Sequence, residues 1–470
     1  MKKQIFLLMM VAFTWMGHQG SAQVDRTKAP VADKPAKIKL GKPKRFTLPN
    51  GLKVLVVSDH KLPTVTFSLG MYNTPQLEGE KAGLSAVAGS LMGTGTTNRS
   101  KDEINNTIEQ MGSYIGAGAN GAYATALSRN TESTFEILSD VVINAKFEQE
   151  EFDKILKNML ANISSVPTSQ SSIAGNVAAV AKYGTDHPYG EVETAETLQN
   201  ITIADCEAFY KSSYSPNNAY LTFIGDITFK DAKALAEKYF SKWEKGENTF
   251  KELVQPQAPE KTRVAFANFD AAQQSDIRIS YPVQFNPTEK DYIATNLMIK
   301  IFGGGSNGRL FQNLRETHGY TYGAYANISG SRFVGSVNAS AKVRNEVTDS
   351  AVVQFLNEMK AIREKEVSEK ELATAKAEYI GSFARGLESS RQVASFAISK
   401  ELYNLPADYY TTYIQKIEAV TLEDIKKAAE RFIKPENANI IVVGKGDVIR
   451  EKLNQFGEVT EYGPYGEVIK

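Results

Sequence analysis

The first folded stretch of the chain has the apolar pattern of a β-hairpin. Two extended runs, 45–49 and 52–57, flank Asn50-Gly51, a dipeptide that favours tight hairpin turns. Residues 64–71 alternate between apolar and polar positions, which predicts a further strand. Glycine- and alanine-rich stretches over 114–120 and 122–129 are also predicted to be strands.

Apolar residues at helical spacing predict the helices of this half. Within residues 81–92, one buried face is marked by Leu84, Val87, Ala88 and Leu91. The stretch from Ser100 to Glu103 has a capping-box pattern and predicts the start of the next helix. Further helices are predicted over 135–145, 150–163 and 202–214, with a strand over 219–224. Strands and packed helices in this order indicate an α+β domain with a mixed or antiparallel sheet.

The end of this half recurs near the C-terminus. Thr202–Asp205 aligns with Thr421–Asp424, and Gly225 aligns with Gly444, at one constant spacing. A single spacing kept over such a length indicates a duplicated domain rather than a short repeat. The sequence therefore predicts two homologous α+β domains.

The expected domains occupy most of the chain. They are placed at 45–245 and 261–470, joined by a polar linker at 246–260. Residues 1–22 have the basic start, apolar core and small-residue end of a secretory signal peptide. Residues 23–44, rich in Lys, Pro and Ala, are predicted to form an extended arm. The leader predicts a periplasmic or secreted protein, and its apolar core is too short for a membrane anchor.

The charges of the chain balance. Lys plus Arg number 54 and Asp plus Glu number 54, so no bias indicates nucleic acid or an anionic membrane as a partner. Cys206 is the single cysteine, which excludes a disulfide framework within the chain. It shares a helical face with Ile203 and Phe209 and is predicted to be a core residue.

The stretch 303–322 concentrates the candidate chemistry. A glycine-rich bend opens it, a helical apolar pattern follows, and a turn at Gly319 precedes a predicted strand. Arg315 and Tyr322 flank that turn, where the guanidinium and the phenol would converge on one ligand. Neither residue is a usual nucleophile or metal ligand, so the pair indicates binding.

Other interpretations of this stretch stay open on spacing alone. Gly303–Gly308 fits a dinucleotide loop, and Gly304–Gly308 fits a hydrolase nucleophile elbow around Ser306. Both need a preceding strand, whereas residues 292–302 are predicted to be helical. A flexible turn is the structural alternative. For the pair itself, the alternatives are an ion pair of Arg315 with Glu316 and a core strand position for Tyr322.

Several stretches together resemble the pitrilysin/insulinase family of zinc peptidases, which includes insulin-degrading enzyme and the mitochondrial processing peptidase. They are F-T-L-P-N-G-L-K-V from Phe46, Gly83-Leu84 through Gly95-Thr96, residues 183–190, and the stretch 303–322. The resemblance covers about Leu40 to Asp447. It implies the family's α+β fold of two homologous domains, an insulinase-like half-clamshell.

The family's zinc motif is degenerate in this chain. Active members hold zinc on an inverted H-x-x-E-H helix and on a later glutamate. The resemblance places the helix positions on Ala86, Gly89 and Ser90, and the later glutamate on Asn162. None of them is a residue with which the family binds zinc.

The histidines lead to the same expectation without any alignment. Beyond His18 in the leader, the chain has only His60, His187 and His318, so no two lie one helical turn apart. The chain is therefore expected to hold no metal or other cofactor, and zinc is expected in a partner subunit.

The second half departs less from the family. In members of the family, an arginine and a tyrosine seven residues apart bind the substrate backbone opposite the zinc. Arg315 and Tyr322 match that spacing. Gly303, Gly304 and Gly305 lie where the processing peptidase carries a substrate-recognition loop. The resemblance implies a non-catalytic subunit that binds a peptide or unfolded polypeptide, which a homologous zinc-bearing partner cuts. The alternatives are a non-proteolytic structural or assembly protein of this fold, and a stand-alone serine hydrolase using Ser306.

Overall fold

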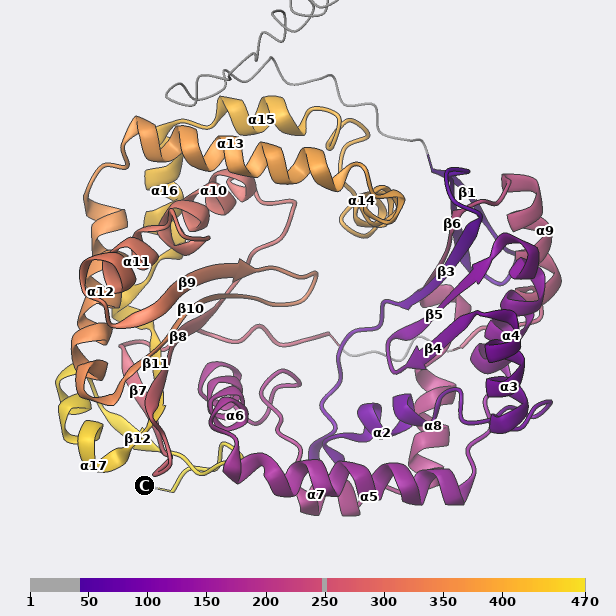
Figure 1. Cartoon of the computed structure of the whole chain (residues 1–470), viewed down its shortest axis with the longest axis horizontal. Helices are drawn as coiled ribbons and strands as arrows, with labels where there is room; N and C mark the ends of the chain where they lie inside the picture. Colours follow the sequence, from indigo (N-terminus) through magenta and orange to yellow (C-terminus); the bar gives the residue numbers. More distant parts are fainter. Residues whose placement is uncertain (1–42, 247–251, 470) are drawn as a thin grey trace, which may run out of the picture. The chain divides into compact units, whose positions relative to one another are not determined.

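The computed structural model describes residues 43–246 and 252–469 (Figure 1). The predicted signal peptide at 1–22 and nearly all of the predicted arm at 23–44 lie outside the described residues, as does part of the predicted linker. Across the two described ranges, no helix combines the length and the apolar character needed to cross a bilayer.

The first half builds a six-stranded mixed sheet. The hairpin, the strand at 64–71 and the two glycine-rich strands are all present, close to their predicted bounds. The parallel pair is β2 with β6, and the remaining neighbours are antiparallel. In spatial order the strands are β1 (Lys44–Thr47), β2 (Lys53–Ser58), β6 (Ala219–Gly225), β3 (Thr64–Met71), β5 (Gly121–Leu127) and β4 (Tyr114–Gly118).

The second half builds a matching six-stranded mixed sheet. Its β7 and β11 form a parallel pair, as β2 and β6 do, and β8, β10 and β9 follow in the places of β3, β5 and β4. In spatial order the strands are β12 (Val459–Glu461), β7 (Arg263–Asn268), β11 (Asn439–Gly444), β8 (Gln274–Val283), β10 (Gly335–Arg344) and β9 (Thr321–Ser329). The predicted α+β fold of two homologous domains is confirmed.

Helices cover the sheets (Figure 1). The first half contributes α2 (Leu84–Leu91), α3 (Lys101–Met111), α4 (Thr131–Ile143), α5 (Gln149–Ser165), α6 (Gln170–Tyr183), α7 (Ala195–Gln199), α8 (Ile203–Ser213) and α9 (Phe229–Phe240). The second half contributes α10 (Tyr292–Gly303), α11 (Arg309–Phe311), the π-helix η6 (Gln312–Thr317), α12 (Thr348–Glu364), α13 (Glu369–Gly386), α14 (Ser390–Leu402), α15 (Tyr413–Ala419), α16 (Leu422–Phe432) and α17 (Gly446–Ile449).

The capping patterns read from the sequence recur as structure. Ser100 caps α3 through a complete capping box with Glu103. Thr202 and Thr421 cap α8 and α16 with the same reciprocal bonds, as the duplication requires. Cys206 on α8 is fully buried, and burial raises the pKa of its thiol to about 12, so its assignment to the core is confirmed.

Two helices pack on the sheet of the other half. The face of α6 with Ile173 and Val177 covers Ile441 and Val443 of β11 in the second sheet. In return, α14 places Val393 and Ala394 against Val57 and Ile224 of the first sheet. Each sheet is thus completed by a helix from the other repeat. The helix α6 was not among the helices predicted from the sequence.

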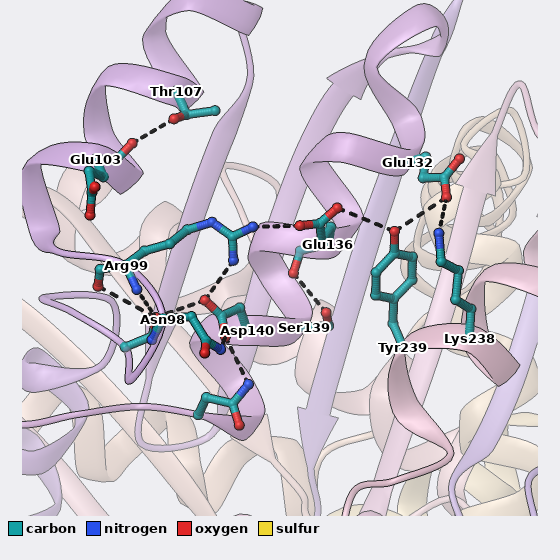
Figure 2. Close-up of polar contacts among 12 residues, drawn as sticks. Asn98, Arg99, Glu103, Thr107, Glu132, Glu136, Ser139, Asp140, Lys238 and Tyr239 are labelled. Atoms are coloured by element: carbon teal, nitrogen blue, oxygen red, sulfur yellow. Dashed lines mark hydrogen bonds and ion pairs between the residues drawn. The ribbon is translucent and has the colours of Figure 1, made fainter.

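A buried carboxylate ties α4 to the loop that follows α2 (Figure 2). Asp140 is 4% exposed and accepts hydrogen bonds from Thr96, Asn98, Arg99 and Asn144, at 2.6–2.8 Å. Burial acts to raise the pKa of Asp140, but these four donors outweigh it and hold the pKa below its ordinary value. The carboxylate is therefore charged and well satisfied in the folded protein.

Candidate functional site

The glycine-rich bend is held by its neighbours. Lys300 Nζ donates to the Gly304 carbonyl at 2.6 Å and pairs with Glu378 at 2.8 Å. Asn307 Nδ2 donates to the same Glu378 carboxylate at 2.6 Å. At Gly303, a Cβ would lie 2.5 Å from the backbone nitrogen of Ala326 in β9, so only glycine fits there.

These contacts narrow the interpretations of the bend. The helix α10 leads into it, so neither a dinucleotide loop nor a nucleophile elbow around Ser306 has the strand it needs. Gly303 is buried, while Gly304 and Gly305 are partly exposed, and Gly305 has a φ of +148°. Glu378 pairs with Lys300, which in turn holds the Gly304 carbonyl, and accepts from Asn307, so side chains brace the bend.

Arg315 projects from the π-helix η6, whose wide turn is closed by a bond from the His318 nitrogen to the Asn313 carbonyl. Its Nη1 donates to the backbone carbonyl of Tyr322 at 3.1 Å. Its guanidinium also lies 4.8 Å from the ring centre of Phe311. The alternative ion pair with Glu316 exists at 3.5 Å, but both side chains are about half exposed and screened by water.

Tyr322 stands on a β-bulge at the start of β9. Ala324 faces Ala341 and Thr321 faces Val343, so Tyr322 and Gly323 together stand opposite Lys342. Without the extra residue, the alternation of the strand would turn Tyr322 toward the core face occupied by Ala324. Instead its side chain is 87% exposed, and its hydroxyl has no hydrogen-bond partner among the described residues. The alternative of a core strand position for Tyr322 is wrong.

The predicted pair is therefore brought together. The Arg315 guanidinium contacts the Tyr322 backbone carbonyl rather than the Tyr322 phenol. Tyr322 lines a cavity of about 880 Å³ between α6 and the strands β8, β10 and β9. Arg315 is not among its lining residues and instead holds the main chain that carries Tyr322. Neither the bulge nor the π-helix that creates this arrangement is marked by a local pattern in the sequence.

The degenerate zinc positions lie on α2 and α5 and do not fit zinc. Ala86 is partly buried and Gly89 is buried, while Ser90 is exposed and its hydroxyl donates to the Ala86 carbonyl at 2.8 Å. Asn162 is exposed on α5. Within residues 43–246 and 252–469, no group of three or more His, Cys, Asp or Glu side chains is placed to hold a metal ion.

The three histidines of the described chain have separate roles. His60 Nδ1 lies 2.6 Å from Asp226 Oδ1 at the surface. His187 is buried, and its ring stacks on that of Tyr183 at 5.4 Å. His318 stacks on Tyr320 at 5.0 Å. The helix α2 thus has no histidine near a motif position.

Packing also prevents a glutamate at the central motif position. A Cβ on Gly89 would lie 2.4 Å from the backbone nitrogen of Ala119, in the turn between β4 and β5. Backbone atoms cannot yield as a flexible side chain does. A carboxylate at residue 89 therefore requires the helix and the turn to move apart.

We expect Gly89→Ala to lower the free energy of unfolding by about 1–3 kcal/mol, because the added methyl overpacks the contact with Ala119. Urea unfolding followed by circular dichroism measures the change. Ser90→Ala, an exposed position on the same helix, is the matched control and should remain close to the native protein. An unchanged urea midpoint for Gly89→Ala would contradict the close approach.

Comparisons with known proteins identify the fold and the family. The profile described as insulinase, peptidase family M16, matches residues 56–186. The profile described as the peptidase M16 inactive domain matches residues 200–379. The chain belongs to peptidase family M16.

Several bacterial proteins resemble this chain along most of their length. A Rickettsia felis protein named an uncharacterized zinc protease is 27% identical over 338 residues, which are 70% of this chain and 80% of that protein. The Bacillus subtilis uncharacterized zinc protease YmxG is 21% identical over 419 residues, 86% of this chain and 99% of that protein. These relatives carry the name of zinc proteases, whereas this M16 chain lacks zinc-binding residues at the motif positions.

Two solved bacterial structures share the fold. A peptidase M16 inactive domain from Pseudomonas fluorescens superposes with a TM-score of 0.78 at 24% identity, covering 86% of this chain and 98% of that one. The periplasmic protease PqqL of Escherichia coli superposes with a TM-score of 0.69 at 17% identity, covering 90% of this chain but 49% of that one. The PqqL chain thus has about as much sequence again outside the match.

Proposed function

We propose that this M16 chain is the non-catalytic, substrate-binding subunit of a zinc metalloendopeptidase. A homologous subunit with an intact zinc motif would cut the peptide or unfolded polypeptide that this chain holds. The observation that carries the proposal is a contrast between the two sheets. The helix α2 has no zinc ligand at Ala86 or Ser90 and no room for a glutamate side chain at Gly89. In the second sheet, the bulge in β9 exposes Tyr322, and Arg315 holds the Tyr322 carbonyl.

The chemistry of this pair suits a peptide backbone. The Tyr322 hydroxyl is an exposed donor on a strand, and a strand aligns with an extended peptide. Arg315 uses Nη1 on the Tyr322 carbonyl, and its side chain stays 46% exposed, so other guanidinium N–H groups remain for a substrate carbonyl. Donors aimed at a carbonyl would orient the scissile bond and stabilise the negative charge that develops on its oxygen. The zinc that activates water for the attack would be supplied by the partner.

Two further features support the proposal. PqqL carries about twice the matched length in one chain, so a protease that shares this fold and has a second portion exists. Residues 1–22 have the pattern of a secretory leader, and we place the complex in the periplasm or outside the cell on that ground.

The test is reconstitution from separate subunits. The purified mature chain is expected to bind no stoichiometric zinc and to cut no peptide, because its motif positions offer no ligand. Mixed with a homologue that has the intact H-x-x-E-H motif, it should form a complex that cuts an unfolded polypeptide faster than the homologue alone. Metal analysis, size-exclusion chromatography and a quenched-fluorescence peptide assay give the three readouts.

Two outcomes would decide against the proposal. If the zinc-bearing homologue cuts the polypeptide at the same rate alone and together with this chain, a structural or assembly role would be favoured. Cleavage by this chain alone, insensitive to chelators and lost in Ser306→Ala, would favour the serine hydrolase.

A further inference from the structure

The cavity beneath Tyr322 has a polar wall that a buried sheet face does not need. Along β8, the side chains of Asp276, Arg278 and Ser280 line the cavity, while Ile277 and Ile279 point to the core on the opposite face. Next to it on the same sheet, α6 seats apolar residues on β7 and β11. The polar wall on β8 therefore begins where the apolar packing of α6 on β7 and β11 ends.

Cations outnumber anions around this cavity. Among its lining residues, Lys182, Arg278 and Lys342 are cationic and Asp276 alone is anionic. Lys182 Nζ donates to Asn338 Oδ1 at 3.0 Å, and no carboxylate of the described ranges forms an ion pair with it. Burial, followed by the charge of Arg278, lowers the pKa of Lys182 to about 8, as expected for an ammonium without a counter-ion.

Arg278 keeps a donor free for a ligand. Its Nε donates to Asp276 at 3.0 Å, and its Nη2 donates to Asp276 at 3.2 Å and to the Ser171 carbonyl at 3.3 Å. Its Nη1 has no hydrogen-bond partner among the described residues. Gly175 of α6 lies over this nitrogen, where even a Cβ would stand 3.9 Å away, so the helix leaves the guanidinium edge open.

A buried hydroxyl in the same wall also lacks a partner. Ser280 is 2% exposed, lines the cavity, and its Oγ makes no hydrogen bond within the part of the chain that the structure describes. Asn338 stands opposite Ser280 in the strand register and already accepts from Lys182. Buried polar atoms are normally satisfied, so this hydroxyl is a donor that remains available to a ligand in the cavity.

We propose that the cavity between α6 and the strands β8, β10 and β9 binds a carboxylate of the peptide that Tyr322 holds. The carboxylate would accept from Lys182 Nζ, Arg278 Nη1 and the Ser280 hydroxyl, which together offer a charged, partly dry site. The inference rests on the proposed function, since it takes a peptide as the ligand. A carboxylate has two sources in a peptide, an acidic side chain and the C-terminus.

The experiment measures peptide binding by the mature chain itself, without a partner. Fluorescence anisotropy would compare four versions of one labelled unfolded peptide: with glutamate or glutamine at one position, and with a free or an amidated C-terminus. We expect a carboxylate to strengthen binding about ten- to hundredfold. The pair of peptides that shows the difference identifies the source of the carboxylate.

Variants then locate the effect. Lys182→Met should remove the preference for the carboxylate while leaving the glutamine, amidated peptide as before. Lys427→Met on α16, which removes a 65% exposed cation elsewhere, is the matched control and should keep the preference. Ser280→Ala serves as a second variant, since it breaks no hydrogen bond of the described protein, and should weaken the preference by about threefold or more.

The outcomes separate the two proposals. Equal binding of all four peptides, with Tyr322→Phe still weakening each of them, would overturn the carboxylate site and leave the proposed function intact. A carboxylate preference that survives both Lys182→Met and Ser280→Ala would also overturn it. Absence of any peptide binding would count against the proposed function, and with it against the inference.

Discussion

Tyr322→Phe is expected to lower peptide turnover by the reconstituted complex by about a hundredfold, without weakening assembly of the subunits. The substitution removes one hydroxyl from a residue that is 87% exposed. Because that hydroxyl forms no hydrogen bond with the described residues, the stability of the fold should not change. Within the proposed function, that hydroxyl donates to the carbonyl on which negative charge develops. The loss should therefore appear in kcat more than in KM.

Tyr114→Phe is the matched control. Tyr114 begins β4, the strand of the first sheet that corresponds to β9, and is 61% exposed. Removing its hydroxyl should leave turnover unchanged. Equal turnover of native complex and Tyr322→Phe would remove Tyr322 from the mechanism and favour a purely structural chain.

Arg315 extends the same experiment, because it acts on Tyr322 as well as on the substrate. Arg315→Ala removes the 3.1 Å bond to the Tyr322 carbonyl and the contact with the Phe311 ring. Both KM and kcat should worsen, since the bulge loses its support. Arg315→Lys should restore little, because an ammonium cannot hold the carbonyl and lie flat on the ring at once.

Asp140→Ala is expected to lower the free energy of unfolding by about 3–5 kcal/mol. The carboxylate is buried and receives four hydrogen bonds, one from the Arg99 guanidinium (Figure 2). Its removal leaves the Asn98 amide without its acceptor, and Arg99 keeps only its ion pair with Glu136. Thermal and urea unfolding of the mature chain would measure the loss.

Glu132→Ala on the same helix is the matched control. Glu132 pairs with Lys238 at 2.7 Å, but both side chains are more than half exposed, and such pairs add little to stability. Its unfolding should match that of the native chain. Equal stability of Asp140→Ala and Glu132→Ala would show that the buried network does not hold the loop after α2.

The pH dependence of this difference follows from the lowered pKa of Asp140. Because the folded protein stabilises the ionised form of Asp140, the stability that Asp140 contributes is fully present above the pKa of the unfolded chain, about 3.9. It disappears as the pH falls through the lower, folded value. The stabilities of native chain and Asp140→Ala should therefore converge in acid.

Local rules predict much of this fold and less of its site. The hairpin turn at Asn50-Gly51 and the capping box from Ser100 to Glu103 depend on neighbouring residues, so the sequence displays them. The duplication is visible because Thr202–Asp205 and Gly225 recur at one spacing as Thr421–Asp424 and Gly444. The sequence identifies Gly89 as a degenerate motif position, but its packing against Ala119 depends on a distant turn that no local pattern predicts.

The site itself depends on features that no local pattern encodes. The bulge at Tyr322 arises from the register of β9 against β10, thus from pairing between strands. The cationic cavity needs Lys182 of α6 beside Arg278 of β8, which only the placement of α6 on the second sheet brings together. Periodicity predicts that a helix has an apolar face, but not which sheet the face covers.

The reciprocal placement of α6 and α14 has a consequence for how the chain folds. Val177 and Val393 each complete a hydrophobic surface that belongs to the other repeat. A fragment ending before residue 247 would leave the apolar face of α6 uncovered and its own β2 and β6 without α14. This fragment and the complementary fragment from residue 252 onward, made as separate polypeptides, should each be insoluble alone. Mixed together they should be soluble, since each supplies the helix that the other lacks. The two repeats are therefore expected to fold as one unit rather than as independent units.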